Sequence, residues 1–361
     1  MSLGLNLYLA IGRANNSLIN GRNADIMLYM NNTVQKNCAL CGAGATRTYV
    51  GMIGYIENSK FDIYECNSCN ASFVDPLKSP ENIYNHIYRQ VEIIPGYMRY
   101  HRFAELVKKV KKPLDVLANL ENTYWSVREA LNNSFSNKND INILEIGSGL
   151  GYLTYSLNRY GYKTTGLDLS KEAVSKARQR YGNFYEAGDL FVVSKTKSNL
   201  YDCVIMTELI EHVEDPKEFI LAALSLLKDG GKLIVTTPNK TKSKKGIVWQ
   251  SDAPPVHLWW FAEESFNKLA EKLNKKIEFI DFTPYTSKFF DYGADSSMDQ
   301  IQLSLPRLLA NGDVDPTKAV HSIKTKLLGV RLHSLLAYIK LRLKHKNPSP
   351  RSSSMCFVIT K

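Results

Sequence analysis

The chain has 361 residues, of which 44% are hydrophobic and 22% charged, a composition typical of a globular protein with a sizeable core. Its length predicts a main domain with smaller attachments, and no stretch approaches the roughly 20 uncharged apolar residues that a membrane span needs. The net charge of +11 is concentrated near the end, because Pro316–Lys361 contain ten Lys or Arg and no Asp or Glu. The basic character therefore says little about the rest of the chain.

Residues 1–37 are polar and weakly patterned, so we expect a loosely ordered extension. Their short apolar start, MSLGLNLYLAIGR, lacks a charged n-region and is not interpreted as a signal peptide. We expect a cytoplasmic protein.

Four of the six cysteines form two CxxC pairs, 24 residues apart, around the strand-like stretches YVGMIGYI and FDIYEC. This spacing predicts a four-thiolate zinc ribbon, and its zinc should be structural because four thiolates leave no open coordination position. The predicted ligands are Cys38, Cys41, Cys66 and Cys69.

Residues 76–138 follow the ribbon and favour helices, and we expect them to form a lid. After the linker-like SNKND, strands alternate with helices. Strands are predicted at 141–146, 162–169, 183–189, 201–207, 232–238 and 275–284, and helices at 151–161, from Lys171 with Ser170 as its cap, at 216–231 and at 263–274. This order predicts an α/β domain with a mainly parallel sheet covered on both faces.

A long connection separates the sixth strand from a last strand-like stretch, SMCFVITK. We interpret the connection as an inserted basic helical element. The predicted organisation is an extension (1–37), a zinc ribbon (38–75), a helical lid (76–138), a main domain (139–284), the insertion (285–353) and the last strand of the main sheet (354–361).

A glycine-rich segment joins the first strand to the first helix of the main domain. Its glycines, Gly147, Gly149 and Gly151, let the backbone approach a ligand closely. Dinucleotide sites place the third glycine five residues after the first, whereas here it comes four after. Glu145 would sit poorly beside a pyrophosphate but well beside a cationic amino group.

Two more acids end successive strands. Asp168, followed by Leu169, ends the second strand, where a carboxylate can accept both hydroxyls of a ribose. Asp189, followed by Leu190, comes after the third strand and could accept from an adenine amino group. Ligands of open α/β sheets bind at this edge, so we expect these acids to share one site with Glu145.

Residues 139–283 resemble class I S-adenosylmethionine-dependent methyltransferases, through ILEIGSGLG, GLDLS, AGDL and YDCVIMTELIEHVEDP in that family's order. The resemblance implies a Rossmann-like fold and S-adenosylmethionine as cofactor. It implies that Glu208 lines the cofactor pocket, with the glycine loop and the strand-end acids.

The stretch EHV resembles the ubiquinone-type O-methyltransferase branch. His212 suits a general base for a hydroxyl acceptor, and Glu211 could orient it or, with Glu208, hold a divalent cation. The alternative is that Glu208 and Glu211 only line the pocket while His212 packs or caps.

The loop after the fifth strand carries Lys240, Lys242, Lys244 and Lys245, then DAPPVHLWWF. His257 with Trp259 and Trp260 is placed to contact the acceptor, although the tryptophans could equally be core anchors. The lysines favour an anionic acceptor such as a nucleotide sugar, unless they form only a solvated loop.

Similar ribbons precede this domain in sugar-modifying methyltransferases, a looser resemblance that depends on CALCG, CNSCN and FVDP. It implies an acceptor that is a sugar in a glycan pathway, methylated at a hydroxyl or a carbon. A quinone-like small molecule is the first alternative, and a non-catalytic RNA-binding or scaffold protein the second. Nucleic acid is the less favoured partner, because the ribbon itself carries little positive charge.

The tail contains Leu328, Leu332, Leu335, Leu336, Ile339 and Leu343, which would share one face of a helix flanked by basic residues. Such a helix in 316–350 could contact an anionic membrane peripherally or pack its apolar face on the body.

Overall fold

The computed structural model describes residues 35–80, 82–94, 96–241, 253–289, 306–317, 319 and 348–361. Outside these residues lie positions 1–34 of the predicted N-terminal extension, the lysines 242, 244 and 245, and the predicted tail helix. Among the described residues, no helix is both long and apolar enough to cross a membrane.

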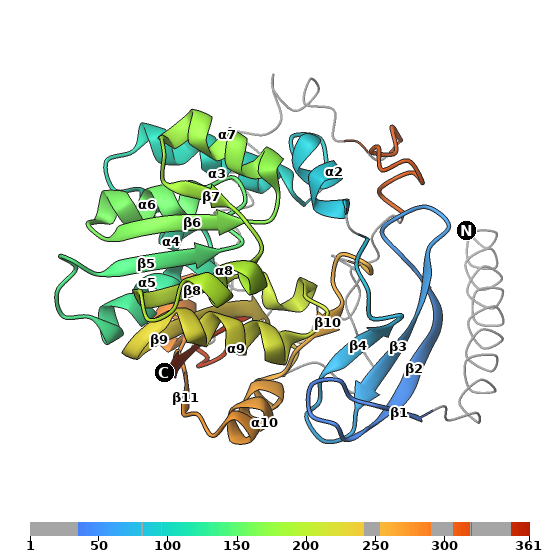
Figure 1. The fold of residues 1–361 in the computed structure, drawn as a ribbon. Coiled ribbons are helices and arrows are strands. Elements are labelled where there is room, and N and C mark those ends of the chain that lie inside the picture. Colours follow the sequence, from blue (N-terminus) through green and yellow to red (C-terminus); the bar gives the residue numbers. More distant parts are fainter. Residues whose placement is uncertain are drawn as a thin grey trace, which may run out of the picture.

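Two sheets organise the described chain (Figure 1). The strands are β1 (Gln35–Asn37), β2 (Gly44–Ile53), β3 (Lys60–Cys66), β4 (Ser72–Asp75), β5 (Asn142–Ile146), β6 (Lys163–Asp168), β7 (Tyr185–Ala187), β8 (Tyr201–Thr207), β9 (Leu227–Pro238), β10 (Trp259–Trp260), β11 (Ile277–Phe279) and β12 (Ser354–Thr360). The helices are α2 (Ile83–Arg89), α3 (Met98–Leu106), α4 (Pro113–Leu120), α5 (Asn122–Ser134), α6 (Tyr152–Tyr160), α7 (Lys171–Tyr181), α8 (Leu190–Thr196), α9 (Pro216–Leu226), α10 (Glu263–Leu273) and α11 (Thr283–Thr286), with 3-10 turns η1 (Val107–Lys109) and η2 (Ile210–His212).

The main sheet has the strand order β11-β12-β9-β8-β5-β6-β7. Neighbours from β9 to β7 pair in parallel, whereas β12 pairs antiparallel with both β9 and β11. This confirms the predicted α/β class and the predicted last strand, which inserts between β9 and β11. The predicted sixth strand is shorter than expected and runs antiparallel to β12.

Successive residues of each central strand face opposite sides of the sheet, which explains why these strands are apolar throughout. In β5, Ile143 packs among α4, α5, α6 and α7, whereas Leu144 packs on the face covered by α9 and α10. Ser170 caps α7 as predicted, accepting a hydrogen bond from the Ala173 amide at 3.2 Å.

The boundary between α9 and β9 differs from the prediction. The helix ends at Leu226, and the segment that we predicted as its last turn and glycine stop belongs to β9. The reason is that Leu227 pairs with Tyr201 of β8, so the chain is already part of the sheet before it reaches the two glycines.

The helices of 76–138 divide into two groups. Helices α4 and α5 pack on the main sheet, and Trp125 of α5 lies in its core. Helix α2 instead contacts α7 near the carboxyl ends of the strands (Figure 1). The lid role of 76–138 stays a prediction, and the packing of α4 and α5 on the main sheet does not fit it.

The second sheet, β1-β2-β3-β4-β10, is antiparallel and contains the cysteine pairs. Its last strand, β10, comes from the main domain, and its buried side chains belong to the same apolar core as β5 and β8. The ribbon and the main domain thus share one apolar core.

The described part of 306–317 is irregular rather than helical. Leu308 forms isolated bridges with Ile56 at the ribbon's β2–β3 turn and with Val314. This departs from the predicted helical insertion, because these residues pair with the ribbon instead of with one another in a helix.

Candidate functional site

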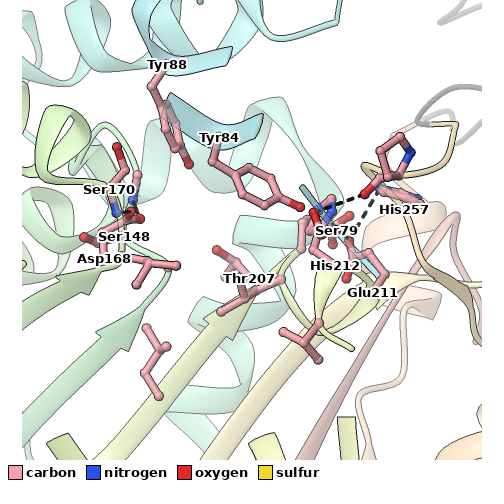
Figure 2. A pocket seen from close by; sticks show the side chains of 18 of the residues that line it. Ser79, Tyr84, Tyr88, Ser148, Asp168, Ser170, Thr207, Glu211, His212 and His257 are labelled. Atoms are coloured by element: carbon pink, nitrogen blue, oxygen red, sulfur yellow. Dashed lines mark hydrogen bonds and ion pairs between the residues drawn. The ribbon is translucent and has the colours of Figure 1, made fainter. Parts of the chain in front are cut away.

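A cavity of about 1660 Å³ opens at the carboxyl ends of the parallel strands (Figure 2). One end is lined by the glycine loop and the loops after β6 and β7, and the other by the loop after β8, the segment before β10 and the ribbon's β2–β3 turn. Helix α2 covers both ends of the cavity. Every predicted cofactor-binding residue except Gly151 lines this cavity.

The glycine loop requires glycine at its three predicted positions. Gly147, Gly149 and Gly151 all have left-handed φ angles, of 73°, 51° and 79°. A Cβ on Gly151 would lie 2.6 Å from the Tyr185 ring, so this glycine allows α6 to begin against the sheet. The helix N-terminus is thereby directed toward the cavity.

Glu145 is the penultimate residue of β5, just before this loop, and is 2% exposed. Its Oε2 accepts a hydrogen bond from the Thr154 hydroxyl of α6. Burial raises the pKa of Glu145 to about 8, and the nearby charge of Asp168 acts in the same direction. A buried acid of this kind favours a cationic partner, which would restore its ordinary ionisation.

Asp168 holds the glycine loop to β6. Its Oδ2 accepts from the Gly149 amide at 2.7 Å, and its Oδ1 accepts from the Ser170 amide at 2.8 Å. Burial raises the pKa of Asp168. Because each carboxylate oxygen has two lone pairs, the same oxygens can still accept hydroxyl donors from the cavity.

Asp189 also plays a structural part. Its Oδ1 caps α8, accepting from the amides of Phe191 and Val192 at 2.7 and 3.2 Å. Leu169 is 68% exposed at the cavity mouth, whereas Leu190 is buried. The adenine contact of Asp189 stays a prediction.

Glu208 follows β8 with a left-handed φ of 47°, an unusual conformation for a glutamate. Its amide donates to the Thr236 carbonyl at 3.0 Å, and its Oε1 accepts from the Thr123 hydroxyl at 3.3 Å. Burial raises its pKa to about 7, and the positive charge of Arg99 opposes this shift. Glu208 thus lies between the two ends of the cavity.

Glu211, His212 and His257 come together at the acceptor end (Figure 2). The carboxylate oxygen Oε1 of Glu211 lies 3.8 Å from His212 Nε2 and 4.0 Å from His257 Nε2. Glu211 is 1% exposed, and its Oε2 accepts from the Thr237 hydroxyl at 2.9 Å. The two imidazole rings meet edge-to-face with centroids 4.7 Å apart.

The hydrogen bond of His212 fixes its tautomer. Its Nδ1 lies 2.6 Å from the carbonyl oxygen of Val256, and a carbonyl can only accept, so Nδ1 carries the proton. In the neutral ring, Nε2 is then the nitrogen that can take up a proton. The carboxylate of Glu211 would stabilise the resulting imidazolium. The same three side chains could instead hold a divalent cation, since one ligand atom from each lies within 4.8 Å of the others.

The predicted acceptor contacts of the neighbouring tryptophans are not observed. Trp259 and Trp260 are 0% and 1% exposed, and as β10 they pair with β4 of the ribbon. They are therefore the core anchors of the alternative interpretation. His257, two residues before Trp259, lies at the cavity wall.

Lys240 also departs from the solvated or acceptor-facing lysine that the sequence suggested. It is fully buried, and its Nζ donates to Glu65 at 2.9 Å and to Ser72 at 2.7 Å. This ion pair joins the loop after β9 to the ribbon. Lys240 therefore gives no support to an anionic acceptor.

The four predicted thiols lie together at one end of the ribbon, all within 4.8 Å of one another. Sγ of Cys38 is 3.8 Å from that of Cys69, and Sγ of Cys41 is 3.4 Å from that of Cys66. These separations suit four thiolates around one tetrahedral ion, and the chemistry of the donors fits zinc.

Sequence reasoning missed several cavity residues that come from outside the resembling segment. Arg99 of α3, Thr123 of α5 and Arg307 of the predicted insertion contribute to the site or line it. No motif marks them. Tyr84 and Tyr88 belong to the predicted lid, and their spacing of four residues puts both on one face of a helix.

Comparison with known proteins gives one family match: the family described as "Methyltransferase domain" covers residues 120–278. Among curated proteins, the ubiquinone biosynthesis O-methyltransferase of Xanthomonas euvesicatoria pv. vesicatoria is 33% identical over 136 residues, 36% of this chain and 54% of that protein. That of Nitrosococcus oceani is 36% identical over 104 residues, 27% of this chain and 44% of that protein. The chain thus spans about half the length of these relatives.

Solved structures show only weak similarity. A methyltransferase from Thermotoga maritima, titled a possible histamine N-methyltransferase, has a TM-score of 0.41 and 19% identity, covering 77% of this chain and 99% of that one. One from Archaeoglobus fulgidus has a TM-score of 0.40 and 15% identity, covering 65% and 93%.

Residues 120–278 therefore match a methyltransferase domain, and the resemblance to class I S-adenosylmethionine-dependent methyltransferases is confirmed. The match begins before the predicted boundary at 139 and includes α5. This agrees with the packing of α5 on the main sheet.

Proposed function

We propose that the protein transfers a methyl group from S-adenosylmethionine to a hydroxyl of a small acceptor. The observation that carries the proposal is the single cavity that joins the glycine loop, Glu145 and Asp168 to the Glu211–His212 pair. A cofactor site alone would fit many transferases. A histidine of defined tautomer at the other end adds a base for the acceptor.

Different residues would act at the cofactor end and at the acceptor end of the cavity. Bound S-adenosylmethionine supplies an electrophilic methyl group on a sulfonium. Glu145 would bind the amino group of its methionine part and Asp168 its ribose hydroxyls. His212 Nε2 would take the proton of the acceptor hydroxyl, while Glu211 stabilises the charged ring. The cavity would align the two reacting atoms.

The acceptor is proposed as a quinone-like phenol. The curated relatives are named for ubiquinone biosynthesis. Rings of Phe61, Tyr84 and Tyr97 line the acceptor end and would suit a flat, partly apolar molecule. A phenol also gives up its proton more readily than a sugar hydroxyl, so one histidine suffices.

A sugar acceptor, the first expectation from the sequence, is the second candidate. It is favoured by the ribbon, whose β2–β3 turn contributes Ile56 and Ser59 to the cavity and which lies outside residues 120–278, the part matched by the methyltransferase domain family. The anionic acceptor and the peripheral membrane contact of 316–350 remain untested proposals.

Transfer of labelled methyl groups tests the reaction. The purified protein is incubated with labelled S-adenosylmethionine and two acceptor panels, catechol-type phenols with short prenyl chains and nucleotide sugars. We expect label in the phenol panel and its loss in His212→Gln. Label only in nucleotide sugars would favour the second candidate, and no label in either panel despite cofactor binding would contradict the proposal.

We also propose one structural zinc held by the four ribbon thiolates. Elemental analysis of the purified protein should find one zinc per chain, and none in a variant lacking Cys38 and Cys69. Absence of zinc from the folded wild-type protein would contradict this assignment.

A further inference from the structure

Helix α2 is anchored to the cofactor end of the main domain. The Ser170 hydroxyl donates to Asn85 Oδ1 at 2.8 Å, and Lys176 Nζ donates to the Tyr88 carbonyl at 3.0 Å. Ser170 follows Asp168 by two residues and caps α7, which contains Lys176. Helix α2 is therefore tied to the loop and helix that follow the predicted ribose acid.

Two tyrosines extend from α2 into the cavity, one toward each end (Figure 2). Tyr84 meets the His212 ring edge-to-face at 5.8 Å between centroids, and its hydroxyl donates to the Val256 carbonyl at 3.3 Å. Tyr88, one turn later, lies on the side of Asp168, Ser148 and Ser170. One helix face thus covers both the cofactor end and the acceptor end.

The Tyr88 hydroxyl lies directly over the glycine loop. A Cβ built on Gly149 would be 2.8 Å from this hydroxyl oxygen, so only glycine allows the tyrosine to approach so closely. The Gly149 amide is the group that donates to Asp168 Oδ2. The phenol and the carboxylate therefore border the same small volume. Burial and the charge of Asp168 raise the pKa of Tyr88 well above its usual value, which keeps the hydroxyl protonated and able to donate.

We propose that Tyr88 is a cofactor-binding residue: its ring closes α2 over the cofactor and its hydroxyl hydrogen-bonds a ribose hydroxyl beside Asp168. The proposal rests on the proposed function, since it assumes that S-adenosylmethionine occupies the glycine-loop end. It adds to the strand-end site a contact from outside the resembling segment. A ribose so placed would be held between a carboxylate from β6 and a phenol from α2.

Through this contact, α2 would cover the cofactor end of the cavity. In this proposal, entry or release of the cofactor would move Tyr88 away from Gly149 and would open the Asn85–Ser170 hydrogen bond and the hydrogen bond from Lys176 to the Tyr88 carbonyl. Asn85→Ala should therefore speed cofactor dissociation with less effect on the contacts inside the closed site. Arg89→Ala is the matched control on the same helix, because Arg89 pairs with Asp313 and does not line the cavity.

Calorimetry with S-adenosylhomocysteine and its 2′-deoxy and 3′-deoxy analogues tests the proposal on the full chain. We expect Tyr88→Phe to weaken S-adenosylhomocysteine by roughly two- to tenfold, the size of one hydrogen bond. For one of the two deoxy analogues, Tyr88→Phe should weaken binding less than it weakens binding of S-adenosylhomocysteine. The reason is that this analogue already lacks the ribose hydroxyl that Tyr88 would contact. Arg89→Ala, which changes the same helix at a residue that does not line the cavity, should leave cofactor affinity unchanged.

Three results would overturn the proposal. Equal affinity of Tyr88→Phe and wild type means that the hydroxyl makes no contact. A loss that is the same for all three ligands places the contact away from the ribose. Tighter binding by Tyr88→Phe identifies the hydroxyl as an occluding group. If the wild-type protein binds no S-adenosyl compound, the proposed function fails as well, which separates that failure from these three.

Discussion

Replacement of Glu145 by glutamine should change how the stability of the ligand-free protein depends on pH. In the folded protein, burial raises the pKa of Glu145 from 4.5 to about 8. The folded state therefore holds a proton on this group that the unfolded state has already lost between these pH values. Since the folded state binds more protons, the free energy of unfolding falls as pH rises through this window.

The size of the effect follows from the same pKa values. Each pH unit crossed costs about 1.4 kcal/mol, so the window from pH 4.5 to about 8 corresponds to ~5 kcal/mol. Glu145→Gln keeps an oxygen that can accept from the Thr154 hydroxyl but cannot ionise. The variant should match the wild type near pH 5 and exceed its stability by several kcal/mol at pH 9.

Urea unfolding at pH 5, 6, 7, 8 and 9, without cofactor, measures this difference. Other buried acids titrate in both proteins, so their contributions cancel when the two curves are subtracted. Addition of S-adenosylmethionine at pH 9 should favour the wild type, because the ionised carboxylate then meets a cation. Parallel stability curves for the two proteins would refute the reasoning about Glu145.

Three further changes test other parts of the account. His212→Gln should lower the turnover number by about 10² or more, with cofactor affinity kept, and should remove the acidic limb of the pH–rate profile; an unchanged profile would exclude this base. Lys240→Met should cost roughly 3–5 kcal/mol in urea unfolding, because Glu65 would stay buried without its cation; a cost below 1 kcal/mol would contradict the buried pair. Chelation of zinc should shift the tryptophan emission to the red, since Trp259 and Trp260 lie between the ribbon and the body, and an unchanged spectrum on complete zinc loss would show that the ribbon does not need the metal.

The strands and helices of the main sheet could be predicted because their signals are local. The apolar runs of β5 and β8, the glycines of the loop and the Ser170 cap each act on residues next to them in the chain. The boundary of α9 escaped prediction for the opposite reason. Its glycine stop signal is local, but the pairing of Leu227 with Tyr201 joins residues far apart in sequence.

The acceptor end of the site shows the same division. His212 was identified from its motif, whereas the position of its ring depends on Val256, 44 residues away. Lys240 looked like one member of a lysine run, and its burial depends on Glu65, 175 residues earlier. Trp259 could have faced either the acceptor or the core, and its pairing with the ribbon decided between them.

The central claim is that the glycine-loop end of the cavity binds S-adenosylmethionine, and calorimetric titration of the ligand-free protein tests it most directly. The account predicts one cofactor bound per chain, with binding lost in Asp168→Ala while the variant still unfolds cooperatively. No heat of binding for S-adenosylmethionine or S-adenosylhomocysteine with the folded wild-type protein would contradict it.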